Sequence, residues 1–304
     1  MHREQVQRDK NIKERTPVNI QWYPGHMTKT RRQMEADLKH VDIVVELVDA
    51  RIPISSRNPD IDAICGDKPR IIMLNRADQA DPQMNKVWVN YFAKERGIQA
   101  ASVDSRSGAG VNQMTALARS VLKGQIARWQ EKGQVGRPIR AMVVGVPNVG
   151  KSTFINKLAK RKSAKAGDRP GVTRGKQWVS VDKGLELLDT PGILWPKFED
   201  ESIGLHLAFT GAVKDEVTDM EGLACALLEL LRDRYPQTLQ ERYKLTELDG
   251  KQGWELLEQG ARKRGMLISG GKADTERMAK VLLDEFRGGK LGRFTLEEPE
   301  DIRA

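Results

Sequence analysis

Paired cysteines and long apolar runs are lacking in this chain of 304 residues, and each lack excludes a class of protein. Its two cysteines, Cys65 and Cys225, do not have the spacing of a disulfide framework or a metal site, which indicates a reducing compartment. No apolar run approaches the roughly 18 residues that a membrane span requires. The first residues mix basic and acidic side chains without an apolar stretch, a poor signal or transit peptide. We therefore expect a cytoplasmic protein.

Lys and Arg total 51 against 42 Asp and Glu, so positive charge predominates, with a net charge of +9. The segment from Lys157 to Lys176 is densely basic and contains the single acid Asp168. Such a segment suits a polyanionic partner, because contacts to phosphate supply most of the non-specific affinity for nucleic acid. A merely solvated surface is the alternative interpretation, but the clustering favours RNA. The candidate RNA-binding residues are Lys160, Arg161, Lys162 and Lys165.

A phosphate-binding loop is predicted at Gly145–Ser152, which has the sequence G-V-P-N-V-G-K-S. Consecutive backbone N–H groups of such a loop surround a polyphosphate, while Lys151 reaches the β- and γ-phosphates. The hydroxyl of Ser152 is the expected Mg²⁺ ligand. The residues predicted at the phosphates are Asn148, Val149, Gly150, Lys151, Ser152 and Thr153.

A second motif, Asn75–Asp78, has the sequence N-R-A-D and matches the guanine selector N-K-x-D with Arg76 in place of lysine. The carboxylate of Asp78 can accept hydrogen bonds from N1–H and the 2-amino group of guanine, and adenine offers no such pair of donors. The motif Asp104–Arg106 resembles S-A-K, whose backbone N–H contacts the guanine oxygen. The candidate residues at the base are therefore Asn75, Arg76, Asp78, Ser105 and Arg106.

Two further segments complete the predicted site. Asp189–Gly192, with the sequence D-T-P-G, follows the apolar run Leu185–Leu188 and so stands at the end of a buried strand. There Asp189 can hold the Mg²⁺ shell, and the Gly192 N–H can meet the γ-phosphate. Thr173, between the phosphate loop and this segment, is the candidate switch I ligand for Mg²⁺.

The order of these motifs is rotated relative to an ordinary GTPase, in which the phosphate loop precedes the base selector. The chain therefore resembles the circularly permuted GTPases. The motif Trp22–Met27 and the C-terminal helical region make it similar to the ribosome biogenesis GTPase A family (RbgA/YlqF), from about Ile20 to Phe294. The resemblance implies a GTPase that binds the assembling large (50S) ribosomal subunit, through rRNA and ribosomal proteins, at a late stage. It would hydrolyse GTP to GDP and phosphate when the subunit stimulates it.

The group that positions the attacking water is not evident from the motifs. Many GTPases place Gln directly after D-x-x-G, but Ile193 stands there and cannot orient water. His26 can swing toward the γ-phosphate once the partner orders its segment, and it fits equally well a loop histidine that stabilises the turn or touches RNA. Asn148 resembles the Asn of potassium-activated relatives, which helps to hold K⁺ between the phosphates, although it can also simply shape the loop. The candidate catalytic set is His26, Asn148, Lys151 and Thr173.

Short apolar, β-branched runs alternate with stretches long enough for helices, which predicts an α/β fold with a doubly wound, mostly parallel sheet. The predicted strands are Val41–Val48, Ile71–Leu74, Ile98–Val103 and Ile139–Val144, with a hairpin of Gln177–Asp182 and Leu185–Leu188. Beyond Gly192, apolar residues recur at i, i+3, i+4 and i+7, which predicts a small all-α domain. The expected division is a polar extension at 1–20, a permuted G domain at 21–200, a helical domain at 201–294 and a solvated acidic tail at 295–304.

Three classes of function fit a phosphate loop in a basic chain. A subunit-stimulated GTPase is favoured by the complete set of motifs. An RNA-binding assembly scaffold with a nucleotide-sensing but weakly hydrolytic site is disfavoured by the intact loop lysine and magnesium ligands. A P-loop phosphotransferase is disfavoured by the guanine selector and by the lack of an acceptor-site signature.

Overall fold

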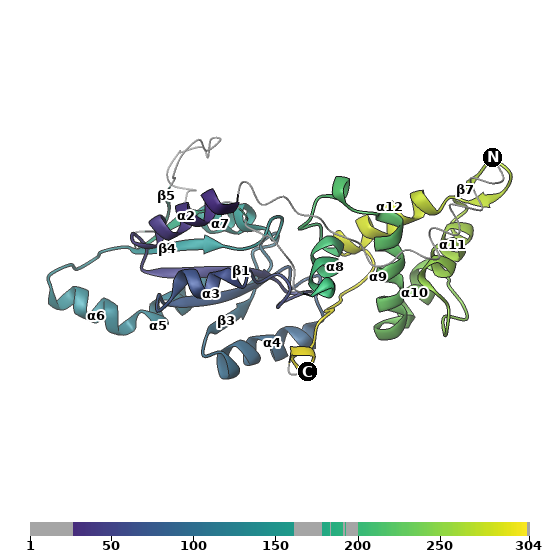
Figure 1. The fold of residues 1–304 in the computed structure, drawn as a ribbon. Coiled ribbons are helices and arrows are strands. Elements are labelled where there is room, and N and C mark those ends of the chain that lie inside the picture. Colours follow the sequence, from purple (N-terminus) through teal and green to yellow (C-terminus); the bar gives the residue numbers. More distant parts are fainter. Residues whose placement is uncertain (1–26, 161–177, 183, 191, 193–199, 303–304) are drawn as a thin grey trace. The chain divides into compact units, whose positions relative to one another are not determined.

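The computed structural model describes residues 27–160, 178–182, 184–190, 192 and 200–302 (Figure 1). The chain divides into two compact units. The sheet unit comprises the described residues of 23–197 together with 297–302, and the helical unit comprises those of 198–296. The chain therefore leaves the sheet unit once, forms the helical unit, and returns to the sheet unit for its last residues.

The sheet unit is built on six strands in the order β3-β2-β1-β4-β6-β5 (Figure 1). Neighbouring strands are parallel except for β5, which pairs antiparallel with β6. The strands are β1 (Ile43–Asp49), β2 (Arg70–Asn75), β3 (Gln99–Ser102), β4 (Ile139–Val144), β5 (Trp178–Asp182) and β6 (Leu185–Asp189). The predicted α/β fold with a mostly parallel sheet is confirmed, and so is the hairpin that ends it.

Helices cover the sheet because its central strands are apolar on both faces, and every residue of β1 is buried. Two hydrophobic clusters lie on the same face of the sheet: Val44 of β1 belongs to the first and Val48 of β1 to the second. These two side chains point to one face because they are an even number of residues apart in the strand. The first cluster contains Met34 of α2, and the second contains Trp88 and Phe92 of α4. The helices of this unit are α2 (Met27–Leu38), α3 (Asp60–Cys65), α4 (Pro82–Glu95), α5 (Gln113–Val121), α6 (Lys123–Glu131) and α7 (Lys151–Lys160).

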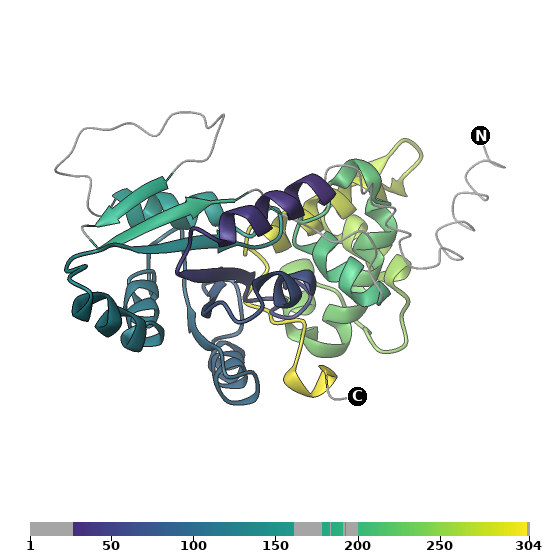
Figure 2. The same ribbon diagram turned by 60° about the vertical axis from the view of Figure 1, so that its left-hand side comes forward.

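The helical unit packs around α9 (Figure 1), and Figure 2 shows its helices in green and yellow from a second side. Its helices are α8 (Glu201–Phe209), η2 (Asp215–Val217), α9 (Met220–Arg234), α10 (Pro236–Tyr243), α11 (Gly253–Lys263) and α12 (Thr275–Arg287). The predicted apolar stripe is buried at Leu223, Leu227 and Leu231, which confirms the helical pattern there. A small hairpin of β7 (Leu267–Ile268) and β8 (Lys272–Ala273) separates α11 from α12. None of the helices in the described ranges is long and apolar enough to cross a membrane.

The last residues differ from the sequence prediction. The segment 295–304 was expected to be a solvated acidic tail, but Thr295, Leu296 and Glu297 are buried. Glu297 is 6% exposed, and the chain then forms the short helix η3 (Pro299–Ile302) beside α4 (Figure 1). The prediction was wrong for these residues because it weighed only the charge of the segment. A carboxylate is buried at low cost where backbone N–H groups are already aimed at it.

Candidate nucleotide-binding site

The sheet order locates the site before any side chain is considered. From β1 the chain proceeds outward through β2 and β3, and then places β4 on the opposite side of β1. Loops that follow two such neighbouring strands diverge and leave a crevice at their carboxyl ends, where ligands of open α/β sheets bind. Asp49 ends β1, and the segment that begins at Gly145 follows β4. The predicted phosphate loop therefore lies at the switch point of the sheet.

The phosphate loop joins β4 to the first residue of α7, which is Lys151. Asn148 and Gly150 adopt positive φ angles of 57° and 103°. A Cβ at position 150 would lie 2.5 Å from Nδ2 of Asn75, so only glycine fits there. This backbone turns its N–H groups toward the amino end of α7, where the helix dipole also favours an anion.

Lys151 is folded back over its own loop. Its Nζ atom donates to the carbonyl oxygens of Gly145 and Val146, at 3.0 Å each. The side chain is buried, and this burial lowers its pKa to about 8, while the nearby carboxylate of Asp189 opposes the shift. A buried ammonium with little compensating negative charge is attracted to an incoming polyphosphate, whose oxygens can replace the two carbonyls.

The structure brings together two of the three predicted magnesium ligands. Asp189 ends β6, and its carboxylate accepts a hydrogen bond from the hydroxyl of Ser152. Desolvation raises the pKa of Asp189, and Lys151 and the Ser152 hydroxyl act in the opposite direction. Thr190 holds this strand end by donating from Oγ1 to the carbonyl of Val143, at 2.6 Å. A hydroxyl and a carboxylate side by side offer the oxygen ligands that Mg²⁺ prefers.

Gly192 lies close to two residues of the phosphate loop. A Cβ built on it would be 2.8 Å from the backbone nitrogen of Pro147 and 2.9 Å from Nζ of Lys151. The D-T-P-G segment therefore passes directly against the phosphate loop, and a larger residue at this position would displace one or the other.

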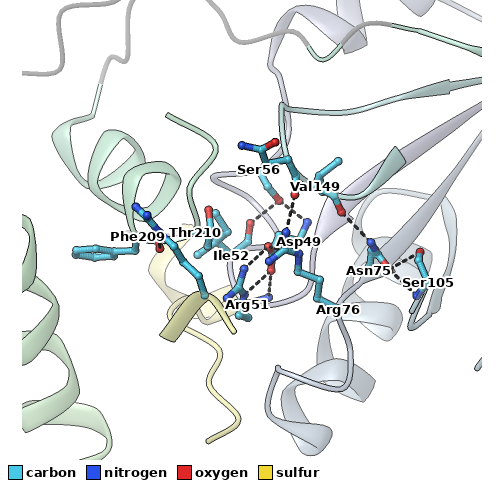
Figure 3. Close-up of polar contacts among 12 residues, drawn as sticks. Asp49, Arg51, Ile52, Ser56, Asn75, Arg76, Ser105, Val149, Phe209 and Thr210 are labelled. Atoms are coloured by element: carbon cyan, nitrogen blue, oxygen red, sulfur yellow. Dashed lines mark hydrogen bonds and ion pairs between the residues drawn. The ribbon is translucent and has the colours of Figure 1, made fainter. Parts of the chain in front are cut away.

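Asn75 connects three loops of the site (Figure 3). It is 2% exposed at the end of β2, and its Nδ2 atom donates to the carbonyl of Val149, at 2.7 Å. Its Oδ1 atom accepts from the backbone N–H of Ser105 at 3.1 Å and from the Ser105 hydroxyl at 2.7 Å. One amide thus joins the selector segment to both the phosphate loop and the S-A-K-like segment. Asn75 lies in the predicted base motif and also holds the loops of the site together.

Arg76 adds a second connection between the selector and the phosphate loop. Its φ angle is 60°, and its Nη2 atom donates to the carbonyl of Asn148, at 2.6 Å. Its Nε atom lies 3.7 Å from Oδ2 of Asp49. The arginine that replaces the usual lysine therefore contacts both the loop and the end of β1, and its fork of donors suits two partners at once.

Asp49 and Arg51 were not identified from the sequence. Asp49 is buried and accepts from Nε, Nη2 and the backbone N–H of Arg51, at 2.9, 2.7 and 3.0 Å (Figure 3). Burial raises the pKa of the Asp49 carboxyl, but Arg51 outweighs it, so the net pKa is below its ordinary value. The available signal was Asp-Ala-Arg at the end of a predicted buried strand, which resembles none of the GTPase motifs.

The side of the site expected to face the base is more open. Asp78 and Arg106 are exposed, in contrast to the buried Asn75 and Ser105. Asp104 shapes the second loop by accepting from the backbone N–H groups of Arg106 and Ser107, at 2.8 and 3.1 Å. An exposed carboxylate beside a loop held by Asn75 can meet the donor edge of guanine.

Several predicted residues lie outside the described ranges, namely His26, Arg161, Lys162, Lys165, Thr173 and Ile193. The backbone of Lys160 ends α7, but its side chain is not among those described. Ser152 and Thr153 are exposed in the first turn of α7, as the phosphate-loop prediction requires. The structure therefore assembles the predicted phosphate, base and magnesium residues, apart from Thr173, at one edge of the sheet.

Comparison with known proteins agrees with this geometry. The model of the 50S ribosome-binding GTPase family matches residues 140–250. The chain is 50% identical over 283 residues to Ribosome biogenesis GTPase A of Bacillus cereus, covering 93% of this chain and 95% of that protein. The GNP-bound structure of YlqF from T. maritima is similar with a TM-score of 0.62 at 32% identity, covering 90% of this chain and 99% of that one. A GDP-bound structure of TM YlqF gives a TM-score of 0.60 at 31% identity, covering 89% and 100%.

Proposed function

This chain belongs to the ribosome biogenesis GTPase A family, and from that premise we propose that it binds GTP with Mg²⁺ and hydrolyses it when the assembling large subunit stimulates it. It is a GTPase of the P-loop type that acts in ribosome biogenesis. The observation that supports the detailed proposal best is the amide of Asn75, which bonds the phosphate loop and the Ser105 loop to the selector strand. Such an arrangement presents the base and phosphate subsites to one nucleotide.

We assign the parts of the nucleotide to residues as follows. The backbone N–H groups of 148–153 surround the phosphates, and Lys151 exchanges its two carbonyl partners for phosphate oxygens. Ser152, Asp189 and Thr173 would hold Mg²⁺, and the Ser152–Asp189 pair fits that set of oxygen ligands. The ion supplies positive charge that neutralises the phosphate oxygens during transfer. Asn148 would in addition place its side-chain oxygen for K⁺, whose charge would act as an arginine finger does in other GTPases.

Guanine selection rests on Asp78. Replacing Asp78 with Asn exchanges an acceptor for a donor, so the variant should bind xanthosine nucleotides in preference to GTP. We expect GTP affinity to fall by about tenfold to a hundredfold, as for the loss of one or two hydrogen bonds to a charged group. Fluorescent-nucleotide titration measures both affinities, and Asp67→Asn, at an exposed position of the same unit, is the matched control. Equal binding of ATP and GTP by the natural protein would refute the assignment.

Hydrolysis of radiolabelled GTP with and without purified large subunits tests the function itself. We expect slow turnover by the protein alone, strong stimulation by the subunit, and a higher rate in K⁺ than in Na⁺. Binding to the subunit without stimulated hydrolysis would favour the RNA-binding scaffold. Transfer of the label to an acceptor other than water would favour the phosphotransferase.

The residue that orients the attacking water is proposed to be His26. Ile193 cannot perform this role, since its side chain neither donates nor accepts a proton. Replacing His26 with Ala should lower the stimulated rate by about a hundredfold to ten-thousandfold, the usual contribution of a positioned general base, and leave GTP affinity unchanged. His40→Ala, at an exposed histidine, is the control. A full stimulated rate in the His26 variant would remove this residue from the mechanism.

The proposed partner surface is the basic segment with Lys160, Arg161, Lys162 and Lys165, which follows the phosphate loop in the chain. Phosphate contacts by these residues would make binding to rRNA depend on salt concentration. Because the segment leads into the predicted switch threonine, rRNA binding and nucleotide state would influence each other. A cytoplasmic location, where large subunits are assembled, accords with this proposal.

A further inference from the structure

Glu297 is bonded to the loop that follows the first strand of the nucleotide site. Its Oε2 atom accepts from the backbone N–H of Ile54 at 2.7 Å, and its Oε1 atom accepts from the backbone N–H of Ser55 at 2.9 Å. Two consecutive N–H groups that converge on one carboxylate form an anion-binding nest. Both contacts are internal to the sheet unit, although they join residues more than 240 positions apart in the chain.

The loop held by Glu297 is in turn bonded to Asp49. The Ser56 hydroxyl accepts from the backbone N–H of Asp49 at 2.9 Å and donates to the carbonyl of Ile52 at 2.7 Å. Asp49 holds Arg51 within the same loop and lies 3.7 Å from Arg76. As described above, Arg76 donates to the phosphate loop. A series of polar contacts, joined through the backbone of the loop and becoming exposed at Arg76, therefore runs from Glu297 to the nucleotide site.

A second series begins at the backbone of the same residue. The carbonyl oxygen of Glu297 accepts from the indole Nε1 of Trp88 at 3.2 Å. Trp88 is fully buried in α4, and Asn85 of the same helix donates from Nδ2 to the carbonyl of Ala77 at 3.1 Å. Ala77 lies between Arg76 and Asp78 in the base selector. Glu297 thus contacts two elements that flank the selector.

The neighbouring residues belong to the helical unit. The carbonyl of Leu296 accepts from Nη1 of Arg234 at 2.9 Å, and the carbonyl of Thr295 accepts from the hydroxyl of Tyr235 at 2.8 Å. Leu296 is therefore anchored within one unit and Glu297 within the other, with no free linker residue between the two anchor points.

We propose that Glu297 is a positioning residue for the guanine-nucleotide site, through which the returning chain end controls the placement of Arg76 and the base selector. It touches no nucleotide in this scheme; it acts through the loop at 50–57 and through Trp88. The inference rests on the proposed nucleotide site, and it adds the C-terminal residues to the groups that determine nucleotide affinity.

Titration of fluorescent GDP and GTP with purified full-length variants tests this role. Glu297→Ala should bind both nucleotides about tenfold more weakly, in the range of couplings carried through intervening residues. Glu297→Gln keeps the shape and one carbonyl acceptor, so it should lose less affinity, and it serves if the alanine variant does not fold. Glu300→Gln, at an exposed position three residues later, should bind like the natural protein.

A double-mutant cycle distinguishes positioning from general destabilisation. In an Arg76→Ala background the main route is already broken, so Glu297→Ala should cause at most a twofold further loss of affinity. Hydrogen exchange should rise in Glu297→Ala at residues 49–58 and 75–78, with the core strand β4 unchanged. Additive losses in the cycle, or natural affinity in Glu297→Ala, would overturn the proposal. Failure of the natural protein to bind guanine nucleotides would instead refute the nucleotide site on which it rests.

Discussion

Two buried carboxylates, Asp49 in the sheet unit and Glu285 in the helical unit, have similar partners and different consequences. Asp49 accepts hydrogen bonds from Arg51. Glu285 accepts from Nε and Nη2 of Arg242, at 3.1 and 2.5 Å, and from the hydroxyl of Tyr243, at 2.8 Å. In each case burial raises the pKa of the carboxyl, and the donors outweigh burial, so the net pKa is below its ordinary value.

The two carboxylates differ in what the residues around them contact next. Arg76 lies beside Asp49 and donates to the phosphate loop, so the network in the sheet unit ends at the nucleotide site. Arg242 and Tyr243 belong to α10 and Glu285 to α12, so the network in the helical unit joins two helices through side-chain hydrogen bonds. A buried, paired carboxylate therefore does not by itself mark a functional site. A carboxylate marks a functional site when its partners also hold a loop that can meet a ligand.

The largest effect expected on nucleotide affinity distinguishes a binding role from a structural role for the phosphate loop. Replacing Lys151 with Ala removes the ammonium that faces the phosphates, so triphosphate affinity should fall by about a hundredfold, as for a lost hydrogen bond to a charged group. The fold should survive, because the substitution removes the cost of burying an ammonium group together with its two carbonyl contacts. Fluorescent-GTP titration and thermal unfolding measure the two quantities, and Lys86→Ala in α4 is the exposed control. Unfolding of the variant would show that this loop, like the Glu285 network, is structural.

In the helical unit we expect a loss of stability without a loss of nucleotide affinity. Replacing Glu285 with Ala leaves the buried hydroxyl of Tyr243 without its acceptor, which should lower the free energy of unfolding by about 2 kcal/mol, as for an unsatisfied buried polar group. Nucleotide affinity of the folded protein should stay the same. Glu276→Ala, which removes an exposed i,i+4 pair with Lys280 in the same helix, should cost less than about 1 kcal/mol. A change in GTP affinity for Glu285→Ala, measured well below its melting temperature, would contradict the separation of the two networks.

The smallest expected effect is a pH dependence of binding. Because the pKa of Lys151 is lowered to about 8, the ligand-free protein loses this proton above that pH, and phosphate binding must take it up again. Triphosphate affinity should therefore fall above pH 8, by at most tenfold per pH unit. The unfolded chain keeps the proton up to its ordinary pKa of 10.5, so the same group makes the ligand-free protein more stable as pH rises from 8 to 10.5.

Calorimetry in two buffers of different ionisation enthalpy measures the proton uptake directly. Lys151→Arg keeps its charge throughout this range, so its binding should show no such uptake. If the natural protein took up no proton above pH 8, Lys151 would be charged before the nucleotide arrives, and its burial would be less costly than the structure indicates.

The sequence by itself determined the strands, the phosphate loop and the rotated order of the motifs. These depend on residues close together in the chain: a β-branched run fills a buried strand, and G-x-x-x-x-G-K-S sets the backbone of one turn. The sequence also placed four site residues at one edge of the sheet, because parallel strands bring their carboxyl ends to the same edge. These residues are Asp78, Lys151, Ser152 and Asp189. The comparisons confirmed the family and the fold that these motifs predicted.

Only the tertiary structure decided how the loops at that edge are held together. Asp49 and Arg51 gained a role because β1 is placed between β2 and β4, and that strand order is not written in any local pattern. Glu297 stands in a segment whose composition predicts a solvated tail, and it is buried because two N–H groups from residues 54 and 55 converge on it. Local sequence sets which groups are donors and acceptors. Which of them meet across more than 240 residues is decided by the packing of the whole chain.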